Sequence, residues 1–402
     1  MIIAKECSGC GACSNICPKN CIEFVLDKEG FLFPKVDEDK CVKCGKCEKV
    51  CPMNQNVEPI STPIVLGAFT KDDSLRYESS SGGVFSEIAC AVLNQGGYVC
   101  GVEFDSENQT AKHIIIDKIE ELYKLRGSKY IQSDIGNIYL KIRELLLHGK
   151  KVLFSGTPCQ VAGLRSCLGS NFSNLVCVEV ICHGVPPTGL WKKYVQHVER
   201  KEKKRIEKVF FRSKKYSWND FGVNTEYWDF SKKFQFSFEN PFFRVFNSNL
   251  CLRETCYNCK FKGLSTRADI ALGDFWHVEE IDANLDDGKG ISIVLLCTNK
   301  GKILFKEIVD KLNICIENVD YEKACKLNAA INKSMPKSDK RDQFLVDMNE
   351  LSFNELSKKY FSLNVKQKLK GVLIRTGLYK VLKSGGQSNM NYGMLIEFVD
   401  RR

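Results

Sequence analysis

Hydrophobic residues follow two different periods along the middle of the chain. Between strand-like segments, apolar residues recur at helical spacing, first from Val84 to Leu93 and again over residues 134–148. The pair Asp117 and Glu120 has the spacing of a helix capping box. Strands that alternate with helices in this way predict an α/β domain. The short apolar runs typical of strands cover residues 64–69, 98–104, 111–116, 151–155 and 175–181.

A further helix should begin directly after the apolar run at residues 151–155. Thr157 has the character of an N-cap, Pro158 suits the first helical position, and Gln160 completes a capping box. Cys159 would then lie in the first turn of this helix. Free amide groups and the helix dipole in that turn favour a thiolate or a bound anion.

The remaining regions have simpler patterns. Residues 22–36 read as a short hairpin around a turn at Gly30, and residues 208–239 are strand-like and rich in aromatic side chains. Helical spacing returns at residues 299–312 and 353–382, on either side of a polar break at 333–341. These patterns predict an aromatic-packed section followed by a helical C-terminal tail.

Composition narrows the class of protein. The chain has 402 residues, enough for two or three domains, and 21 cysteines, far more than packing requires. No apolar run approaches the roughly 20 residues of a membrane-spanning helix, and no basic, apolar leader precedes Cys7. We therefore expect a cytoplasmic protein without a membrane span. Because disulfides are rare in that compartment, the cysteines indicate metal or redox chemistry.

Positive charge is concentrated in the body of the chain. The net charge is +10, yet the first 58 residues hold 8 lysines against 9 acidic side chains. A basic body favours an acidic substrate or an acidic electron-donor protein. Basic clusters such as residues 200–205 are interpreted as solvated helix faces, because no recognition motif accompanies them. We expect no nucleic-acid partner.

Two cysteine motifs near the start identify the metal chemistry. The spacing Cys-x2-Cys-x2-Cys-x3-Cys-Pro occurs at residues 7–18 and again at residues 41–52. In bacterial ferredoxins this spacing holds two 4Fe-4S clusters, and the fourth cysteine of each motif binds the other cluster. The predicted ligands are Cys7, Cys10, Cys13 and Cys51 for cluster one, and Cys41, Cys44, Cys47 and Cys17 for cluster two.

Zinc is the alternative for these motifs, since paired Cys-x2-Cys units also build tetrahedral thiolate sites. Zinc sites do not require a third cysteine two residues later, nor a proline after the fourth. Both features occur twice here, which favours iron–sulfur clusters.

A third metal site is predicted further along the chain. Cys256 and Cys259 are spaced as ligands, and Cys182 follows a strand at the end where open α/β sheets bind ligands. Either Cys251 or Cys159 could complete a set of four thiolates. The alternative is that these are structural thiols.

Two loops have the composition of anion-binding sites. Residues 79–83 and 155–157 combine glycine, hydroxyl groups and the amides of a helix start, which together can hold a pyrophosphate. Neither matches the dinucleotide motif G-x-G-x-x-G, so an ordinary helix start is the alternative in each case.

Five segments of the chain occur in a fixed order, and together they resemble the coenzyme F-420 hydrogenase/dehydrogenase beta-subunit family. The resemblance covers roughly residues 1–300 and implies an FAD-binding reductase fold with an associated 4Fe-4S cluster. The family also includes a chlorophyll-related reductase. The segments are SSSGGVFS at 79–86, RGSKYIQS at 126–133, FSGTPCQ at 154–160, CHG at 182–184, and the block from CYNC at 256–259 to GDFW at 273–276.

The resemblance also implies where a flavin would lie. No family segment is found beyond residue 300, where the tail resembles versions of the family associated with bacterial surface-polysaccharide genes. That departure weakens the deazaflavin as the substrate. The implied flavin-binding residues are Ser80, Ser81, Gly82, Gly83, Lys129, Ser155, Gly156, Thr157 and Gln160.

These observations give one expected architecture: an α+β ferredoxin-like N-terminal module, an α/β flavin-binding body with an antiparallel aromatic-rich section, and a helical C-terminal tail. The expected domains are the two-cluster ferredoxin domain at 1–56, the two parts of the flavoprotein domain at 62–165 and 166–325, and the C-terminal extension at 326–402.

The expected function is that of an FAD- and 4Fe-4S-dependent oxidoreductase. Clusters carry single electrons whereas most organic substrates take two, so a flavin is the natural converter. Electrons would pass from a ferredoxin-type donor to an organic acceptor, either the deazaflavin coenzyme or another small molecule. Lys129 would neutralise charge near the flavin. His183 would donate a proton, or else it is a hydrogen-bonded turn residue.

Two alternatives belong to other classes. The chain could be an electron-transfer subunit of a larger hydrogenase or dehydrogenase complex with no substrate of its own, or a zinc-based regulator. The sequence leaves open the acceptor, the direction of electron flow and whether the chain forms homo-oligomers.

Overall fold

The N-terminal region is a small unit of one hairpin and two short helices. The computed structural model describes residues 6–285 and 287–379 of the chain. β1 (Ile22–Leu26) and β2 (Leu32–Val36) form the expected antiparallel hairpin. α1 (Ala12–Ile16) and α2 (Lys46–Val50) each begin after a glycine in the left-handed region, at φ 79° and 69°. Among the described residues, no helix is both long and apolar enough to cross a membrane.

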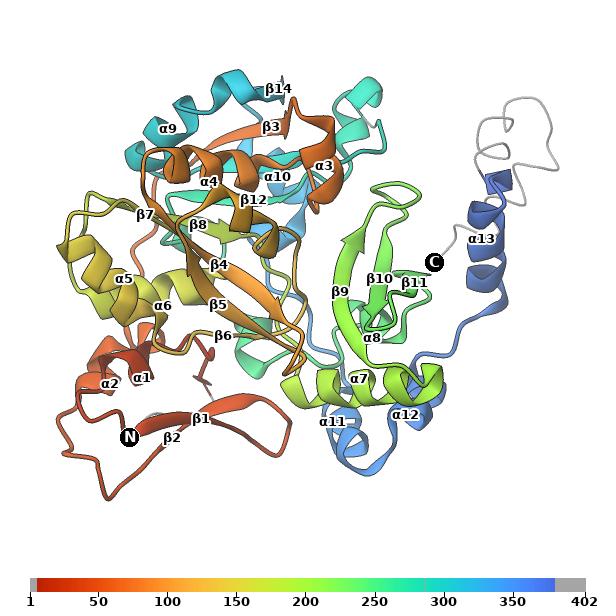
Figure 1. The fold of residues 1–402 in the computed structure, drawn as a ribbon, viewed down its shortest axis with the longest axis horizontal. Helices are drawn as coiled ribbons and strands as arrows, with labels where there is room; N and C mark the ends of the chain where they lie inside the picture. The colour runs from red at the N-terminus through yellow and green to blue at the C-terminus, as the bar shows by residue number, and fades with distance from the viewer. Residues whose placement is uncertain (1–5, 286, 380–402) are drawn as a thin grey trace.

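A mixed sheet forms the centre of the molecule, which confirms the predicted mixture of strands and helices (Figure 1). Its strand order within the described residues is β14-β3-β13-β12-β8-β7-β4-β5-β6. β12, β8, β7 and β4 are parallel, as are β5 and β6, and the other neighbouring pairs are antiparallel. The strands are β3 (Ile64–Thr70), β4 (Tyr98–Asp105), β5 (Thr110–Ile116), β6 (Ser133–Asp134), β7 (Val152–Gly156), β8 (Leu175–Val180), β12 (Ile270–Asp274), β13 (Ser292–Leu296) and β14 (Leu312–Ile316).

Helices cover both faces of this sheet. Because successive residues of a strand point to opposite faces, Leu153 joins one hydrophobic core while Val152 and Phe154 join another. The first core contains side chains of α4 and α9, and the cores of the opposite face contain those of α5, α6 and α10. These helices are α4 (Val84–Asn94), α5 (Ile138–Leu147), α6 (Pro158–Leu168), α9 (Asn299–Lys306) and α10 (Tyr321–Leu327).

The aromatic segment forms a separate antiparallel sheet, in the order β11-β10-β9. The buried Trp191 packs against this sheet, with ring centroids 5.3 Å from Phe211 and 5.0 Å from Phe242. Figure 1 shows this sheet to one side of the central sheet, with α7 beneath it and α13 beyond its far edge. The elements are α7 (Thr188–Glu202), β9 (Ile206–Ser213), β10 (Gly222–Tyr227), β11 (Lys232–Phe236), α8 (Pro241–Asn247), α11 (Arg341–Glu350), α12 (Phe353–Tyr360) and α13 (Val365–Arg375).

Four helix predictions were wrong in detail. The helix expected at 299–312 is shorter, because α9 ends at Lys306 and Leu312 begins β14. The segment after Asp117 forms a 3-10 helix, η3 (Ile119–Lys124), without a side-chain cap. Its buried Leu122 and Leu125 are three residues apart, which matches the three residues per turn of that helix. α5 begins at Ile138 because the preceding residues extend the sheet as β6. The single helix expected at 353–382 is two helices, α12 and α13, and its last residues lie outside the described part of the chain.

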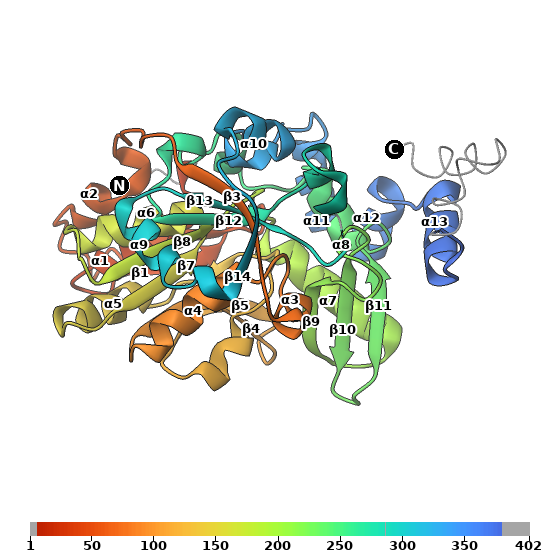
Figure 2. The same cartoon turned by 90° about the horizontal axis from the view of Figure 1, so that it is seen from above.

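The N-terminal unit packs closely against the body. A Cβ atom at Gly163 of α6 would lie 3.0 Å from Cys10 Sγ, so α1 and α6 are in close contact. At the tip of the hairpin, Gly189 N donates a hydrogen bond to Gly30 O at 3.0 Å. Figure 1 shows the N-terminal unit below α5 and α6, with its hairpin extending towards α7, and Figure 2 shows α1 and α6 together from above.

Candidate functional site: three sets of thiols and a buried polar centre

The first set of predicted ligands lines one cavity. Cys7, Cys10, Cys13 and Cys51 border an open cavity between the N-terminal helices. Burial, together with the neighbouring Cys7 and Cys51, raises the pKa of Cys13 to about 12. The fourth cysteine of the second motif therefore lies beside the first motif. Four thiols around one cavity are a donor set that fits an iron–sulfur cluster.

The second set lies nearer the surface. Burial raises the pKa of Cys47, and its neighbours Cys44 and Cys17 add to the effect. Cys44 is exposed, and Cys41 is partly exposed. Cys17 from the first motif therefore lies beside the second motif. Its Sγ is also 3.3 Å from Sγ of the buried Cys21, which lies outside both motifs.

The third set is assembled from three distant segments. Burial raises the pKa of Cys159 to about 12, with Cys182 and Cys259 adding to it. Burial likewise raises the pKa of Cys256 to about 12, with Cys159 and Cys259 nearby. Cys159 lies in the first turn of α6, Cys182 follows β8, and the other two belong to the segment of the 3-10 helix η4 (Glu254–Asn258). These four thiols form one neighbourhood.

Cys251 lies elsewhere. It is fully buried in the aromatic core, and its Sγ is 4.0 Å from Val245 O. Burial raises its pKa, with the Arg341 cation opposing, and no thiol contributes to the shift. Of the two candidates for the fourth thiol, the structure brings only Cys159 to the other three.

The described thiols do not converge on a single metal centre. Among residues 6–285 and 287–379, no three or more Cys, His, Asp or Glu side chains are close enough to hold a single metal ion. A tetrahedral ion needs its ligands at about 2.3 Å from one centre, whereas a multi-iron cluster is held at its corners. The four thiols around the first cavity are placed to bind the corners of such a cluster.

The segments expected to bind flavin are joined by hydrogen bonds. Ser128 N donates to Ser80 Oγ at 2.8 Å, and Gln160 Nε2 donates to Ser133 Oγ at 2.9 Å. The segment 126–133 thus connects the loop 79–83 with the start of α6. The predicted capping box is present, since Thr157 N donates to Gln160 Oε1 at 2.9 Å.

Several polar groups of these loops already have partners inside the protein. Ser81 Oγ donates to Ile291 O at 2.7 Å, and Gly82 N donates to Ser292 Oγ at 2.9 Å. A Cβ at Gly82 would lie 2.5 Å from Ala68 O, so glycine is required for this packing. Gly83 follows in the left-handed conformation, at φ 85°, and serves as the N-cap of α4.

The two predicted catalytic side chains, Lys129 and His183, are partly buried and hydrogen-bonded within the protein. Lys129 Nζ donates to three carbonyls at the end of η3, including Arg126 O at 2.9 Å. Burial lowers its pKa to about 7. His183 shares a hydrogen bond of 2.7 Å with Asn249 Oδ1, and its ring lies 4.7 Å from that of Phe246. Burial lowers its pKa as well.

Sequence reasoning missed a cationic centre beside the loop 79–83. The Arg212 side chain is 2% exposed and lies 3.1 Å from Asp274 Oδ1, while its buried Nε has no partner among the described residues. Lys214 Nζ donates to Ser81 O at 2.6 Å. Burial lowers the pKa of Lys214 to about 7, and Arg212 adds to this. An orphaned donor and two buried cations suit an anionic ligand such as a pyrophosphate.

Tyr130 links this centre to the third thiol set. Burial raises its pKa to about 12; the Arg212 cation opposes the shift, while Asp274 and Cys182 add to it. Nothing in the sequence marked Tyr130 except its place in the segment 126–133. Arg212 could have been suspected, because this cation directly follows the apolar run of residues 209–211.

Family comparisons match most of the chain. Residues 65–138 match the N-terminal model, and residues 149–322 the C-terminal model, of the coenzyme F420 hydrogenase/dehydrogenase beta subunit. Residues 6–55 match a 4Fe-4S dicluster domain, and a second model of that description matches residues 33–86.

Two individual proteins are similar to this chain. The first is a subunit of the F(420)H(2) dehydrogenase of Methanosarcina mazei, 25% identical over 172 residues, which cover 40% of this chain and 47% of that protein. The chain therefore spans about half the length of this relative. The second, a chain of the F420-reducing [NiFe] hydrogenase complex of Methanosarcina barkeri, gives a TM-score of 0.43 at 14% identity, over 75% of this chain and 92% of that chain.

Proposed function

The chain belongs to the coenzyme F420 hydrogenase/dehydrogenase beta-subunit family and carries an N-terminal 4Fe-4S dicluster domain, and from that premise we propose that it is an iron–sulfur flavoprotein oxidoreductase. In this proposal a ferredoxin-type protein donates electrons, and a small organic molecule accepts them. The deazaflavin coenzyme is one candidate acceptor.

The observation that carries the proposal is the order of the three thiol sets. The second set reaches the surface at Cys44, and the first lies between it and the body. Cys10 of the first set is a neighbour of Cys159 of the third, and both belong to the packing between α1 and α6. Redox centres held by these thiols would form a continuous series from the surface to the interior.

Each proposed centre has a set of residues that would hold it. In addition to the two ferredoxin sets, a third cluster would use Cys159, Cys182, Cys256 and Cys259. A flavin would lie along the segments 79–83, 126–133 and 155–160, with the unsatisfied Nε of Arg212 beside Ser80. When bound, the clusters supply one-electron transfer and the flavin converts between one- and two-electron chemistry.

The protein side chains have supporting roles in this scheme. Arg212 and Lys214 supply positive charge beside Ser80 and Ser81, where an anionic group could be held. His183 lies next to Cys182 and could carry a proton. Its hydrogen bond to Asn249 fixes the orientation of the ring. Lys129 stabilises the segment 126–133, because its Nζ donates hydrogen bonds to carbonyl oxygens at the end of η3.

A second candidate function is an electron-transfer subunit without a substrate of its own. It is favoured by the name of the Methanosarcina mazei relative, which is described as a subunit of a dehydrogenase. The exposed second thiol set suits contact with a protein donor in either case.

The test is anaerobic purification followed by quantitation of iron, sulfide and flavin. We expect about 12 irons, counting four for each cluster, and one FAD per chain. About 8 irons would remove the third cluster from the proposal, and a colourless protein that contains zinc would end it. Turnover assays with reduced ferredoxin and a deazaflavin then separate the two functions. Bound FAD without turnover of any acceptor favours the subunit.

A further inference from the structure

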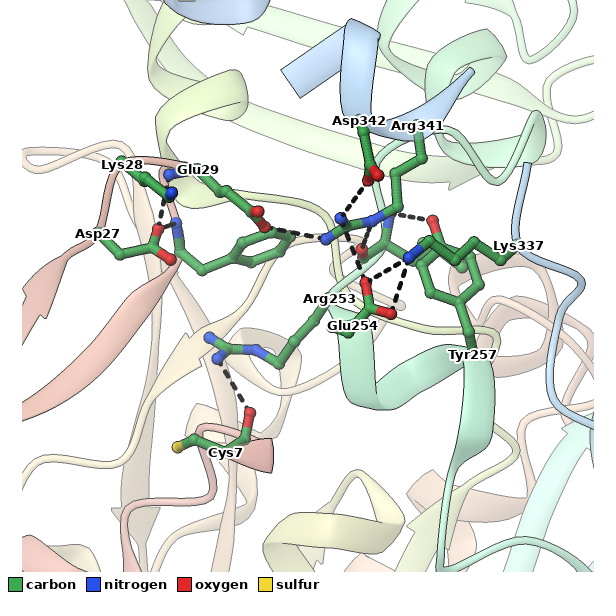
Figure 3. Close-up of polar contacts among 12 residues, drawn as sticks. Cys7, Asp27, Lys28, Glu29, Arg253, Glu254, Tyr257, Lys337, Arg341 and Asp342 are labelled. Carbon is green, nitrogen blue, oxygen red and sulfur yellow. Dashed lines mark hydrogen bonds and ion pairs between the residues drawn. The ribbon is translucent and has the colours of Figure 1, made fainter. Parts of the chain in front are cut away.

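Arg253 connects the third thiol set to the N-terminal unit. It directly precedes η4, which carries Cys256, and its backbone N donates to Val185 O at 2.9 Å. Its side chain crosses to the ferredoxin-like unit, where Nη1 donates to Cys7 O at 3.2 Å and Nη2 to Leu32 O at 2.8 Å. Figure 3 shows the guanidinium directed at Cys7. The residue is 1% exposed.

The guanidinium has no carboxylate as a countercharge. Its acceptors are the two carbonyls and Gln132 Oε1, at 2.8 Å, all of them neutral. In the part of the chain that the structure describes, no acidic group lies within ion-pair distance of it, and its buried Nε has no partner. The rings of Phe31 and Phe33, 5.0 and 4.7 Å away, cover it. An unpaired buried cation is costly, so this arrangement calls for a negative charge nearby.

The groups with the largest electrostatic effect on the Arg253 guanidinium are thiols of two different sets. Cys7 belongs to the first set, whereas Cys256 and Cys159 belong to the third, and each of the three interacts with the Arg253 charge. Asp27 has a weaker effect. When these cysteines ligate metal they are thiolates, and the negative charge that Arg253 lacks is then present on both sides of it.

A second buried arginine illustrates the usual pairing of a buried cation with carboxylates. Figure 3 shows Arg341, which is 2% exposed, among carboxylates. Its Nη2 lies 3.0 Å from Glu29 Oε2, and its Nη1 lies 3.2 Å from Glu254 Oε2 and 3.3 Å from Asp342 Oδ1. Both arginines join the N-terminal unit to the body. Of the two, Arg253 is the one that does so without an acid.

We propose that Arg253 is a positioning residue for electron transfer, a fixed cation shared by cluster one and the third cluster that raises the reduction potential of both. The inference rests on the proposed function, because it requires clusters in the first and third sets. Arginine keeps its charge at every pH that a protein tolerates, so the effect is permanent. Reduction adds negative charge, and a buried cation favours it. Cluster two lies on the surface side, away from this cation.

The test is a redox titration of the anaerobically purified full-length protein, followed by electron paramagnetic resonance. Arg253→Gln removes the charge but keeps hydrogen-bond donors. We expect two of three midpoint potentials to become more negative, each by about tenfold in the reduction equilibrium constant, or about 59 mV for one electron. The third potential should not move. Arg253→Lys retains the charge and should shift both potentials much less.

Arg341→Gln is the matched control, since it removes a neighbouring buried arginine that faces carboxylates. It should weaken the protein but leave all potentials in place. Unchanged potentials in Arg253→Gln, or equal shifts in Arg341→Gln, overturn the inference. If Arg253→Gln loses iron, the Arg253→Lys variant provides the test. Full iron and near-normal potentials in Arg253→Lys support a role for the charge. Loss of iron from Arg253→Lys as well overturns the inference. A parent protein with only about 8 irons would instead defeat the proposed function.

Discussion

At the scale of single residues, the clearest test concerns the fourth thiol of the third set, for which Cys159 and Cys251 are the two candidates. Both are buried thiols, but Cys159 lies among three other thiols whereas Cys251 lies among aromatic rings. Cys159→Ala should therefore lower the iron content by about four per chain, the content of one cluster. Cys251→Ala should keep all of the iron and lose only stability, by about 1–2 kcal/mol for the small cavity. Iron and sulfide quantitation of the two variants measures this.

The two substitutions remove the same atoms, so each controls for the other. Loss of iron from Cys251→Ala with full iron in Cys159→Ala would reverse the proposed ligand set. Equal retention in both would mean that the third set holds no cluster.

The sequence left this choice open for a physical reason. Cys159 and Cys251 are 23 and 69 residues from Cys182, and spacing carries no information over such separations. The order β12-β8-β7 in the sheet decides it, because neighbouring parallel strands bring the start of α6 beside the end of β8. Arg253 was also beyond reach, since its role depends on a contact with Cys7, 246 residues away.

At the scale of elements, His113 on β5 is a buried side chain that the folded protein keeps uncharged. Its ring stacks on Phe154 of β7 at 5.4 Å, and its Nε2 is 3.2 Å from Ser155 O. Burial lowers its pKa to about 4, and the Lys129 cation contributes further. The unfolded chain, with a pKa near 6.5, binds more protons than the folded chain between about pH 4 and 6.5. Stability is therefore lost as the pH falls through this window.

The expected loss from His113 alone is about 1–1.5 kcal/mol between pH 8 and pH 5.5. His113→Gln keeps a donor for Ser155 O but does not titrate, so its stability should fall less over the same range. Urea denaturation of both proteins under anaerobic conditions at the two pH values gives the difference. Parallel losses in the parent and the variant would show that His113 does not resist protonation in the folded state.

Elements with strong local signals were predicted correctly, and those set by tertiary packing were not. The helix at Pro158 has a proline, an N-cap and a capping partner in agreement, and it forms as expected. Asp117 and Glu120 have the same spacing, yet they do not begin an α-helix. Leu122 and Leu125 must both reach the core within a short connection, and a 3-10 helix allows this. Ser133 and Asp134 become a strand because β5 offers them a partner.

At the scale of the whole molecule, the contact between α1 and α6 joins the N-terminal unit to the body. Gly163 permits it, since a side chain there would meet Cys10. Gly163→Leu should push α1 away from α6. We expect faster amide hydrogen exchange in both helices, together with slower delivery of electrons from reduced ferredoxin to the acceptor, because transfer weakens as the first and third thiol sets separate.

Gly371→Leu on α13 is the control for this substitution. The nearest atom there is the end of the flexible Glu239 side chain, which can move aside, so the same added bulk should change neither exchange in α1 and α6 nor the rate. If the Gly163→Leu variant transfers electrons slowly, its iron content shows whether the cause is a longer distance between the thiol sets or the loss of a cluster. Full iron with slow transfer means that the distance between the first and third sets controls the rate, as the series of thiol sets requires. Normal exchange and normal transfer in Gly163→Leu would mean that electrons reach the body without crossing the α1–α6 contact.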